Sequence, residues 1–178
     1  MIHARPISFQ FALAPVLSIV CLVVPAWADF ETGMDAYNRK DYTTALREWR
    51  ALAEQGDADA QDYLGTLYFE GWGVPKDYTK ARQWWGKAAT QGSSSAQSDL
   101  GLPYAKGLGG TQDLVQAYMW YSLAAGNGYE IATGYRNDLA KQMTPAQIAE
   151  AQQLTREWKP KGRRVSTTPC MTACPSKR

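Results

Sequence analysis

The sequence repeats one pattern at a constant spacing of 36 residues, and this feature limits the fold more than any other. When Ala60 is aligned with Ala96, small residues and aromatics coincide at the same phase. The matched positions of the first copy are Leu64, Gly65, Tyr68, Gly71, Gly73, Asp77, Ala81, Trp84, Ala88, Ala89 and Gly92, and those of the second are Leu100, Gly101, Tyr104, Gly107, Gly109, Asp113, Ala117, Trp120, Ala124, Ala125 and Gly128. A fixed period of this length is typical of a solenoid of stacked supersecondary units.

Each copy has the periodicity of two helices. Ala60, Leu64 and Tyr68 recur every four residues, and residues 81–89 place their small and aromatic side chains on one helical face. Residues 29–56 contain a shorter copy with four fewer loop residues, which is in phase only in its second helix. For residues 29–158 the sequence therefore predicts an all-α fold, a short α/α solenoid of about three helix-turn-helix repeats with a C-terminal capping helix pair.

Glycine returns at one place in the first helix of every unit, as Gly33, Gly65 and Gly101. Glycine inside a helix costs roughly 1 kcal/mol relative to alanine, so its return needs a compensating reason. We predict that the partner helix of each pair approaches too closely there for a side chain. Pro103 falls inside the first helix of the third unit, where it removes a backbone donor to the carbonyl of Asp99, and we predict a kink there.

The spaced residues of the first full copy resemble a Sel-like repeat, the longer-looped relative of the tetratricopeptide repeat. They run Ala60-x3-Leu64-Gly65-x2-Tyr68-x2-Gly71-x-Gly73-Val74-x2-Asp77-Tyr78-x-Lys80-Ala81-x2-Trp84-x2-Lys87-Ala88-Ala89-x2-Gly92. Residues 96–128 resemble a second copy, and residues 33–56 look more like the tetratricopeptide form. The resemblance implies a non-catalytic adaptor without a cofactor, whose partner is another protein.

The resemblance also implies where a partner binds, because the first helix of each pair lines the concave side of such solenoids. Transferring those phases gives a predicted concave strip of Met34, Tyr37, Asp62, Thr66, Phe69, Ser98, Leu102 and Ala105. This strip is apolar with few charges, as suits an extended segment or helix of another protein. The alternative is that Phe69 and Leu102 simply pack against the neighbouring helix pair.

Residues 1–28 have the pattern of a cleavable signal peptide. Arg5 provides the positive start, residues 11–25 are mostly apolar, and Ala26 and Ala28 are the small residues before the expected cleavage at Asp29. A membrane anchor is disfavoured because spanning needs about 20 apolar residues and prolines interrupt this run. The sequence therefore predicts a periplasmic or secreted protein.

Residues 159–178 form a basic tail that we expect to be disordered, because it holds six basic residues, no acidic ones and very few apolar ones. Residues 29–158 then carry 12 basic against 17 acidic residues. We expect at most weak contact between the tail and an anionic envelope surface, and no nucleic-acid partner. Cys170 and Cys174 lie in this tail. In an exported chain we favour a disulfide between them or between chains over free thiols, and we favour both of these states over a metal site.

Histidine chemistry is excluded from the predicted mature chain, because His3 is the only histidine of the sequence. Serine or cysteine nucleophiles paired with histidine, histidine acid-base catalysis and histidine metal ligands therefore have no basis there. Paired carboxylates need no histidine, but Asp57, Asp59 and Asp62 cluster where a helix begins, and we interpret them as capping residues. We identify no catalytic residue and no metal site.

The tryptophans are interpreted as core residues with one exception. Trp72 lies in a loop between two glycines, and we predict that it is exposed. The sequence thus favours an interaction scaffold in the cell envelope. The alternatives are a small envelope hydrolase, as ascribed to cysteine-rich relatives whose cysteine pairs residues 59–128 lack, and a self-associating module linked through Cys170 and Cys174.

Overall fold

The computed structural model describes residues 29–161, and every regular element within this range is an α-helix. The helices are α1 (Phe30–Asn38), α2 (Tyr42–Gln55), α3 (Ala58–Glu70), α4 (Tyr78–Thr90), α5 (Ser94–Lys106), α6 (Leu114–Gly126), α7 (Ile131–Ala140) and α8 (Pro145–Glu157). None of these helices is long and apolar enough to cross a bilayer. The predicted all-α class is confirmed.

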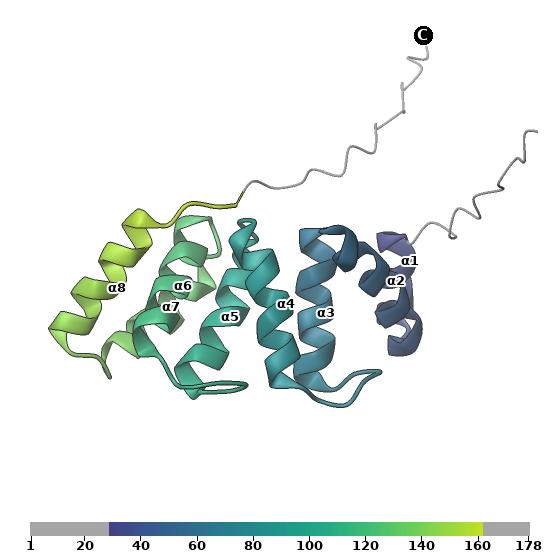
Figure 1. Cartoon of the computed structure of the whole chain (residues 1–178), viewed down its shortest axis with the longest axis horizontal. Helices are drawn as coiled ribbons and strands as arrows, with labels where there is room; N and C mark the ends of the chain where they lie inside the picture. The colour runs from purple at the N-terminus through teal and green to yellow at the C-terminus, as the bar shows by residue number, and fades with distance from the viewer. Residues whose placement is uncertain (1–28, 162–178) are drawn as a thin grey trace, which may run out of the picture.

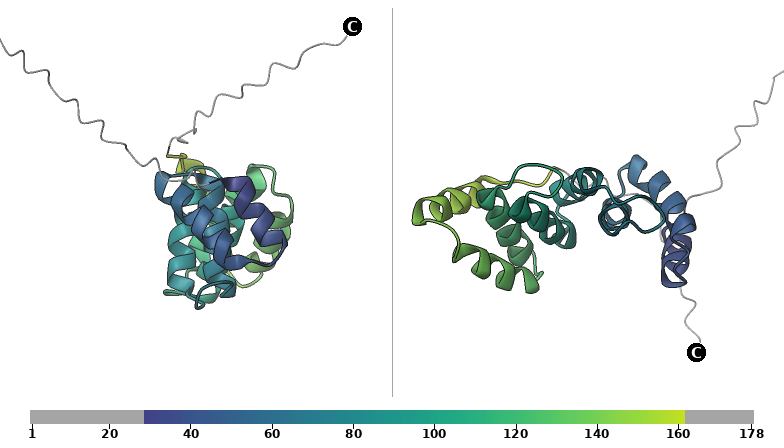
Figure 2. Two further views of the ribbon diagram at one scale, coloured as in Figure 1. Left: turned by 90° about the vertical axis from the view of Figure 1, so that its right-hand side faces the viewer. Right: turned by 90° about the horizontal axis from the view of Figure 1, so that it is seen from below.

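The helices form consecutive antiparallel pairs stacked in one curved row (Figure 1). Contacts run within each of the pairs α1/α2, α3/α4 and α5/α6 and from each pair to the next, whereas α7 and α8 both pack against α6. Seen from below, α1, α3, α5 and α7 lie on one side of the row and α2, α4, α6 and α8 on the other (Figure 2). The predicted three repeats with a capping helix pair are therefore observed.

The glycine that recurs in the first helix of each unit has the steric cause that the sequence predicts. A Cβ added to Gly65 would lie 2.5 Å from Cδ1 of Trp85, and one added to Gly101 would lie 2.5 Å from Cε1 of Tyr121. A Cβ on Gly33 would collide with Trp49 in the same way. In each pair an aromatic ring of the second helix thus lies flat against bare backbone of the first, and the prediction of close approach is confirmed.

Aspartates begin the helices at matching places in the repeats. The side chains of Asp41, Asp77 and Asp113 accept hydrogen bonds from the third backbone N–H of the helix that follows. Asp57 does the same for α3 at 2.8 Å. These bonds satisfy amides that have no partner inside the helix, so the capping predicted for Asp57 is confirmed and the other three aspartates cap their helices in the same way.

A ladder of buried amides joins successive repeats. The amide nitrogen of Gln61 donates to the carbonyl of Ala53 (3.0 Å), and its oxygen accepts from the side chain of Gln91 (2.8 Å). One repeat later Gln97 donates to the carbonyl of Ala89 (3.2 Å) and accepts from Asn127 (2.9 Å). Because each glutamine is buried, these bonds fix the register between neighbouring pairs.

The prediction that Trp72 is exposed is wrong. Its ring stacks on Tyr42 with centroids 5.0 Å apart and an angle of 14° between the planes, and it also touches Tyr37. The loop after α3 folds back onto the start of α2, so closely that a Cβ on Gly73 would lie 2.8 Å from the backbone carbonyl of Tyr42. The longer loops of the later repeats thus pack against the preceding repeat instead of projecting into solvent.

The C-terminal end of the described chain turns back along the solenoid. The helix α8 begins with a capping box of Thr144 and Gln147. After it, Trp158 packs edge-on against Trp120, and the amide of Lys161 donates to the carbonyl of Thr90 at 2.8 Å. The helix α5 continues past the buried Pro103 to Lys106, and the kink predicted there stays a prediction. The predicted signal peptide and the tail cysteines Cys170 and Cys174 lie outside the described residues.

Candidate partner-binding groove

A pocket of about 320 Å³ opens on the side of the first helices, between the second and third repeats. Its lining comes from α3, α5, α4, α6 and α7, namely Thr66, Phe69, Glu70, Ser98, Asp99, Leu102, Trp85, Tyr121 and Tyr135. Four of these nine residues are aromatic, and the buried rings of Trp85 and Tyr121 contribute to the lining. Pockets that bind ligands usually combine such apolar walls with a few polar groups.

The pocket contains half of the predicted concave strip. Thr66, Phe69, Ser98 and Leu102 line it together, although Ser98 is almost fully buried. The ring of Phe69 also packs on Tyr78 and Trp85 of α4. Its side chain therefore serves the core and the pocket at once. Because α4 is the other helix of its own pair, the alternative that Phe69 packs against a neighbouring pair stays a prediction.

The other half of the strip lies elsewhere. Met34 and Tyr37 pack against the core of the first repeats, where Tyr37 touches the rings of Trp49 and Tyr63. Ala105 packs against the core of the C-terminal repeats and does not line the pocket. The predicted strip is thus not one continuous open surface in the described residues.

Asp62 differs from the interpretation of an N-terminal capping residue. It lies one turn into α3, where its Oδ2 accepts a hydrogen bond from the hydroxyl of Ser95 (2.5 Å) and its Oδ1 is buried without a hydrogen-bond partner in the described residues. Burial raises the pKa of Asp62 to about 6, opposed by the Ser95 hydrogen bond and supported by the charge of Asp59. Of this acidic cluster only Asp57 caps the helix, because its side chain accepts a hydrogen bond from the backbone N–H of Ala60.

Asp99 is the residue that the sequence analysis missed. Its carboxylate lines the pocket, and burial, followed by the charge of Asp62, raises its pKa to about 7. No side-chain hydrogen bond or ion pair to it is present among the described residues, whose ion pairs use Glu48, Asp77 and Asp138. The alignment of the repeats could have identified Asp99, because the matching residue one repeat earlier is Tyr63, which differs from it in size and charge.

This exchange changes how the two junctions between repeats are filled. The ring of Tyr63 fills the space between the first two repeats, with its centroid 4.5 Å from that of Trp49, 5.6 Å from Phe30 and 5.9 Å from Tyr37. At the same phase between the next two repeats, the shorter side chain of Asp99 leaves that space open. The exchange of Tyr63 for Asp99 thus removes a ring from this phase and brings a carboxylate to the lining of the pocket.

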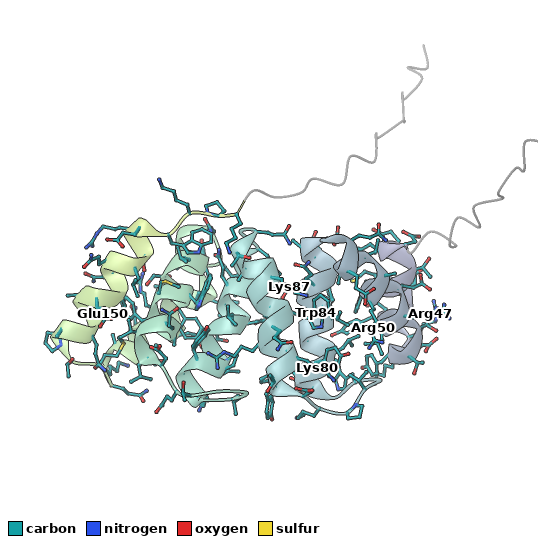
Figure 3. All side chains as sticks on the ribbon, in the orientation of Figure 1. Arg47, Arg50, Lys80, Trp84, Lys87 and Glu150 are labelled. Atoms are coloured by element: carbon teal, nitrogen blue, oxygen red, sulfur yellow. The ribbon has the colours of Figure 1, made fainter. Side chains whose placement is uncertain are left out.

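Basic side chains gather on the opposite face of the solenoid. Arg47 and Arg50 on α2 and Lys80 and Lys87 on α4 lie along the second helices (Figure 3). The ammonium of Lys87 lies 3.7 Å from the ring centre of Trp84, so the lysine side chain covers this partly buried tryptophan. No lysine or arginine lines the pocket, so its carboxylates have no cation beside them within the lining.

The described residues offer little for metal or nucleophilic chemistry. Among residues 29–161 no three histidine, cysteine, aspartate or glutamate side chains are grouped so that they could hold a metal ion. The sequence of this range contains neither histidine nor cysteine. What the pocket can supply is aromatic surface, a half-buried carboxylate in Asp99 and the exposed carboxylate of Glu70.

Comparisons with known proteins agree with this architecture. The family model described as Sel1 repeat matches residues 58–93 and 94–129. A protective antigen of uropathogenic Escherichia coli with an SLR fold is 31% identical, with a TM-score of 0.69, over 82% of this chain and 33% of its own. A Sel1 repeat protein from Oxalobacter formigenes is also 31% identical, with a TM-score of 0.61, over 74% of this chain and 56% of its own. The chain thus spans one third and just over half of these two proteins, and no curated protein matches it.

Proposed function

Because the chain contains two Sel1 repeats in a solenoid of the SLR fold, and such repeats generally mediate protein–protein interaction, we propose that it is a non-catalytic scaffold that binds a segment of another protein along the first helices. The observation that carries this proposal is the aromatic pocket between the second and third repeats. It opens on the side from which solenoids of this kind present an extended binding surface.

The rim of the pocket supports a protein partner. Tyr135 is 51% exposed and Ile131, one turn earlier on α7, is 60% exposed, and they are the large exposed apolar side chains of the described chain. Exposed aromatic side chains beside a pocket are typical of the anchoring points of protein interfaces. A partner segment that enters the pocket would cover Tyr135, whereas nothing comparable faces outward on the second helices.

The location of this scaffold is part of the proposal. Residues 1–28 have the composition of a signal peptide, so the scaffold would act in the periplasm or outside the cell. Fractionation of cells expressing the native chain, with N-terminal sequencing of the product, tests this. We expect envelope or medium fractions and a first residue of Asp29, and a cytosolic product that retains Met1 would contradict it.

Site-specific photo-crosslinking tests the binding face. A benzophenone amino acid replaces Tyr135 at the pocket rim or, as matched control, Glu150, which is exposed on α8 (Figure 3). We expect one defined heterologous protein to be cross-linked in intact cells from position 135 and not from 150. Adducts only with a second copy would favour self-association, and heterologous adducts only from position 150 would contradict the proposed face.

An envelope hydrolase is the second candidate, and Asp99 is the observation that favours it. A carboxyl group whose pKa is raised to about 7 can act as a general acid near neutral pH. Hydrolysis of cell-wall polymer by the purified protein, lost in Asp99→Asn and kept in Glu150→Gln, would establish this function. We rank it second because Sel1 repeats generally mediate protein–protein interaction.

A further inference from the structure

We infer that the pocket between the second and third repeats receives an arginine side chain of the partner segment, with the guanidinium against the carboxylate of Asp99 and between the surrounding aromatic rings. This inference rests on the proposed function, because it names the chemistry of the partner at the same groove. It follows from the shape, the charge and the lining of the pocket.

The charge of the pocket is not balanced within the described chain. Asp99 and Glu70 line it, and the charge of Asp62, which has one buried oxygen without a hydrogen-bond partner, acts on Asp99. None of these carboxylates takes part in the ion pairs of the described residues. Buried carboxylates in folded proteins are normally paired, so a bound cation would supply what the solenoid itself lacks.

The walls of the pocket select the kind of cation. Phe69, Trp85, Tyr121 and Tyr135 present ring surface around the carboxylate. A guanidinium group is planar, weakly hydrated and able to stack on aromatic rings while it donates two parallel hydrogen bonds to one carboxylate. An ammonium group holds its water more tightly and has no flat face to stack. The chemistry of the lining therefore favours arginine over lysine.

The same chain shows that arginine makes this kind of contact elsewhere. The guanidinium carbon of Arg82 lies 3.8 Å from the ring centre of Tyr104 at the junction of the same two repeats. That arginine belongs to the fold, whereas the rings of the pocket have no cation among their lining residues. Tyr63 fills the corresponding space one repeat earlier, so the pocket is a local departure from the repeat and not a feature of every junction.

Binding of a guanidinium would depend on pH through the groups that face it. These are Asp99 on α5, Glu70 on α3, and Tyr121 and Tyr135 on α6 and α7. Asp62 on α3 is outside the lining, but its charge acts on Asp99. Burial raises the pKa of Asp99 to about 7 and that of Tyr121 to about 12, so Asp99 changes charge between pH 5 and 8 and Tyr121 does not. Affinity should therefore rise as the pH increases through about 7.

Selection from a library of random peptides displayed on phage, with the purified protein as target at about pH 8, provides the first test. In the variant Asp99→Tyr a tyrosine ring should fill the pocket, as Tyr63 fills the corresponding space one repeat earlier. Peptides that bind the unmodified protein but not this variant are counted as groove ligands, that is, ligands of the pocket. We expect these ligands to share one essential arginine. Replacing that arginine by citrulline, which has a similar shape without the charge, should weaken binding about tenfold or more, as loss of a charge-assisted hydrogen bond predicts.

Two charge variants sharpen the result. Asp99→Asn keeps the shape of the side chain and should weaken the arginine peptide about tenfold, whereas Glu150→Gln removes a remote exposed carboxylate and should leave binding unchanged. A lysine peptide that binds as tightly as the arginine peptide would overturn the assignment of a guanidinium. Binding that appears only in the double variant Arg163→Gln/Arg164→Gln would identify the protein's own tail as the occupant and overturn the assignment to a partner.

The outcomes also separate this inference from the proposed function. Groove ligands that need no basic residue and bind Asp99→Asn as well as the unmodified protein would refute the arginine assignment and leave the scaffold function standing. A library that contains no groove ligand would count against both.

Discussion

Replacing Gly65 with alanine should destabilise the protein, although alanine is the better helix former. The added Cβ would lie 2.5 Å from Cδ1 and 2.7 Å from Nε1 of Trp85. That ring cannot turn aside freely, because it is 3% exposed and its Nε1 donates a 3.1 Å hydrogen bond to the carbonyl of Asp62. Overpacking of a core costs about 1–3 kcal/mol, and a lost hydrogen bond adds about 1 kcal/mol.

The gain in helix propensity offsets about 1 kcal/mol of that cost, so we expect a net loss of about 1–3 kcal/mol in the free energy of unfolding. Gly86 is the matched control. It lies inside α4 with no heavy atom within 4 Å of the position of a Cβ, so Gly86→Ala should stabilise by about 0.5–1 kcal/mol. The same substitution in two helices of one pair should therefore have opposite signs.

Urea denaturation followed by far-ultraviolet circular dichroism measures both variants. A double-mutant cycle with Trp85→Leu isolates the steric part, because a smaller side chain at position 85 should make Gly65→Ala nearly neutral or favourable. The reasoning fails if Gly65→Ala is as stabilising as Gly86→Ala, or if its cost does not change when the tryptophan is removed. Either result would mean that the helix pair shifts to accept the methyl group.

The remaining predictions concern charge, capping and the amide ladder. Because the pKa of Asp99 is raised from 3.8 to about 7, the folded protein holds a proton that the unfolded chain releases, and stability should fall as the pH rises from about 4 to about 7. Asp99→Asn should remove much of this fall and gain about 2–4 kcal/mol at pH 8, seen as a higher urea midpoint at pH 8 than the unmodified protein and little change near pH 4. Asp57→Ala removes the 2.8 Å bond to the amide of Ala60 and should cost about 1 kcal/mol by thermal denaturation, while Asp57→Ser should restore most of it. Gln97→Leu leaves the carbonyl of Ala89 without its side-chain donor, and it should cost about 1–3 kcal/mol and speed amide exchange at the end of α4.

The fold could be predicted because the packing that defines it repeats. Gly65 with Trp85 and Gly101 with Tyr121 make the same contact in successive repeats. The contact is therefore visible in the sequence as residues that recur every 36 positions. Helix limits followed from aspartate caps and from glycines such as Gly56, which ends α2 in the left-handed conformation with φ of 101°. These are local or periodic effects, and one sequence contains enough information to identify them.

The position of the Trp72 ring and the raised pKa of Asp99 could not be predicted in this way. Trp72 is half-buried because its loop folds back onto Tyr42 of the previous repeat, and helical periodicity says nothing about where a loop lies. The pKa of Asp99 depends on burial among α3, α5, α6 and α7, which exists only once the repeats are stacked. The buried Gln61 and Gln97 share a phase, yet only the structure shows the carbonyls to which they donate.

The contrast between Tyr63 and Asp99 separates what the repeat does for folding from what it does for binding. Stability alone favours the aromatic ring, because it fills the junction between pairs and brings no charge with it. At the matching position Asp99 lines a pocket of about 320 Å³ with a half-buried carboxylate, and both the open space and the partly buried charge lower the stability of the unbound solenoid. Residues that break a local rule at a cost in stability are concentrated at functional sites. A bound cationic segment would remove both costs at once, which is why the place where the two copies differ most in chemistry is the place where we locate recognition.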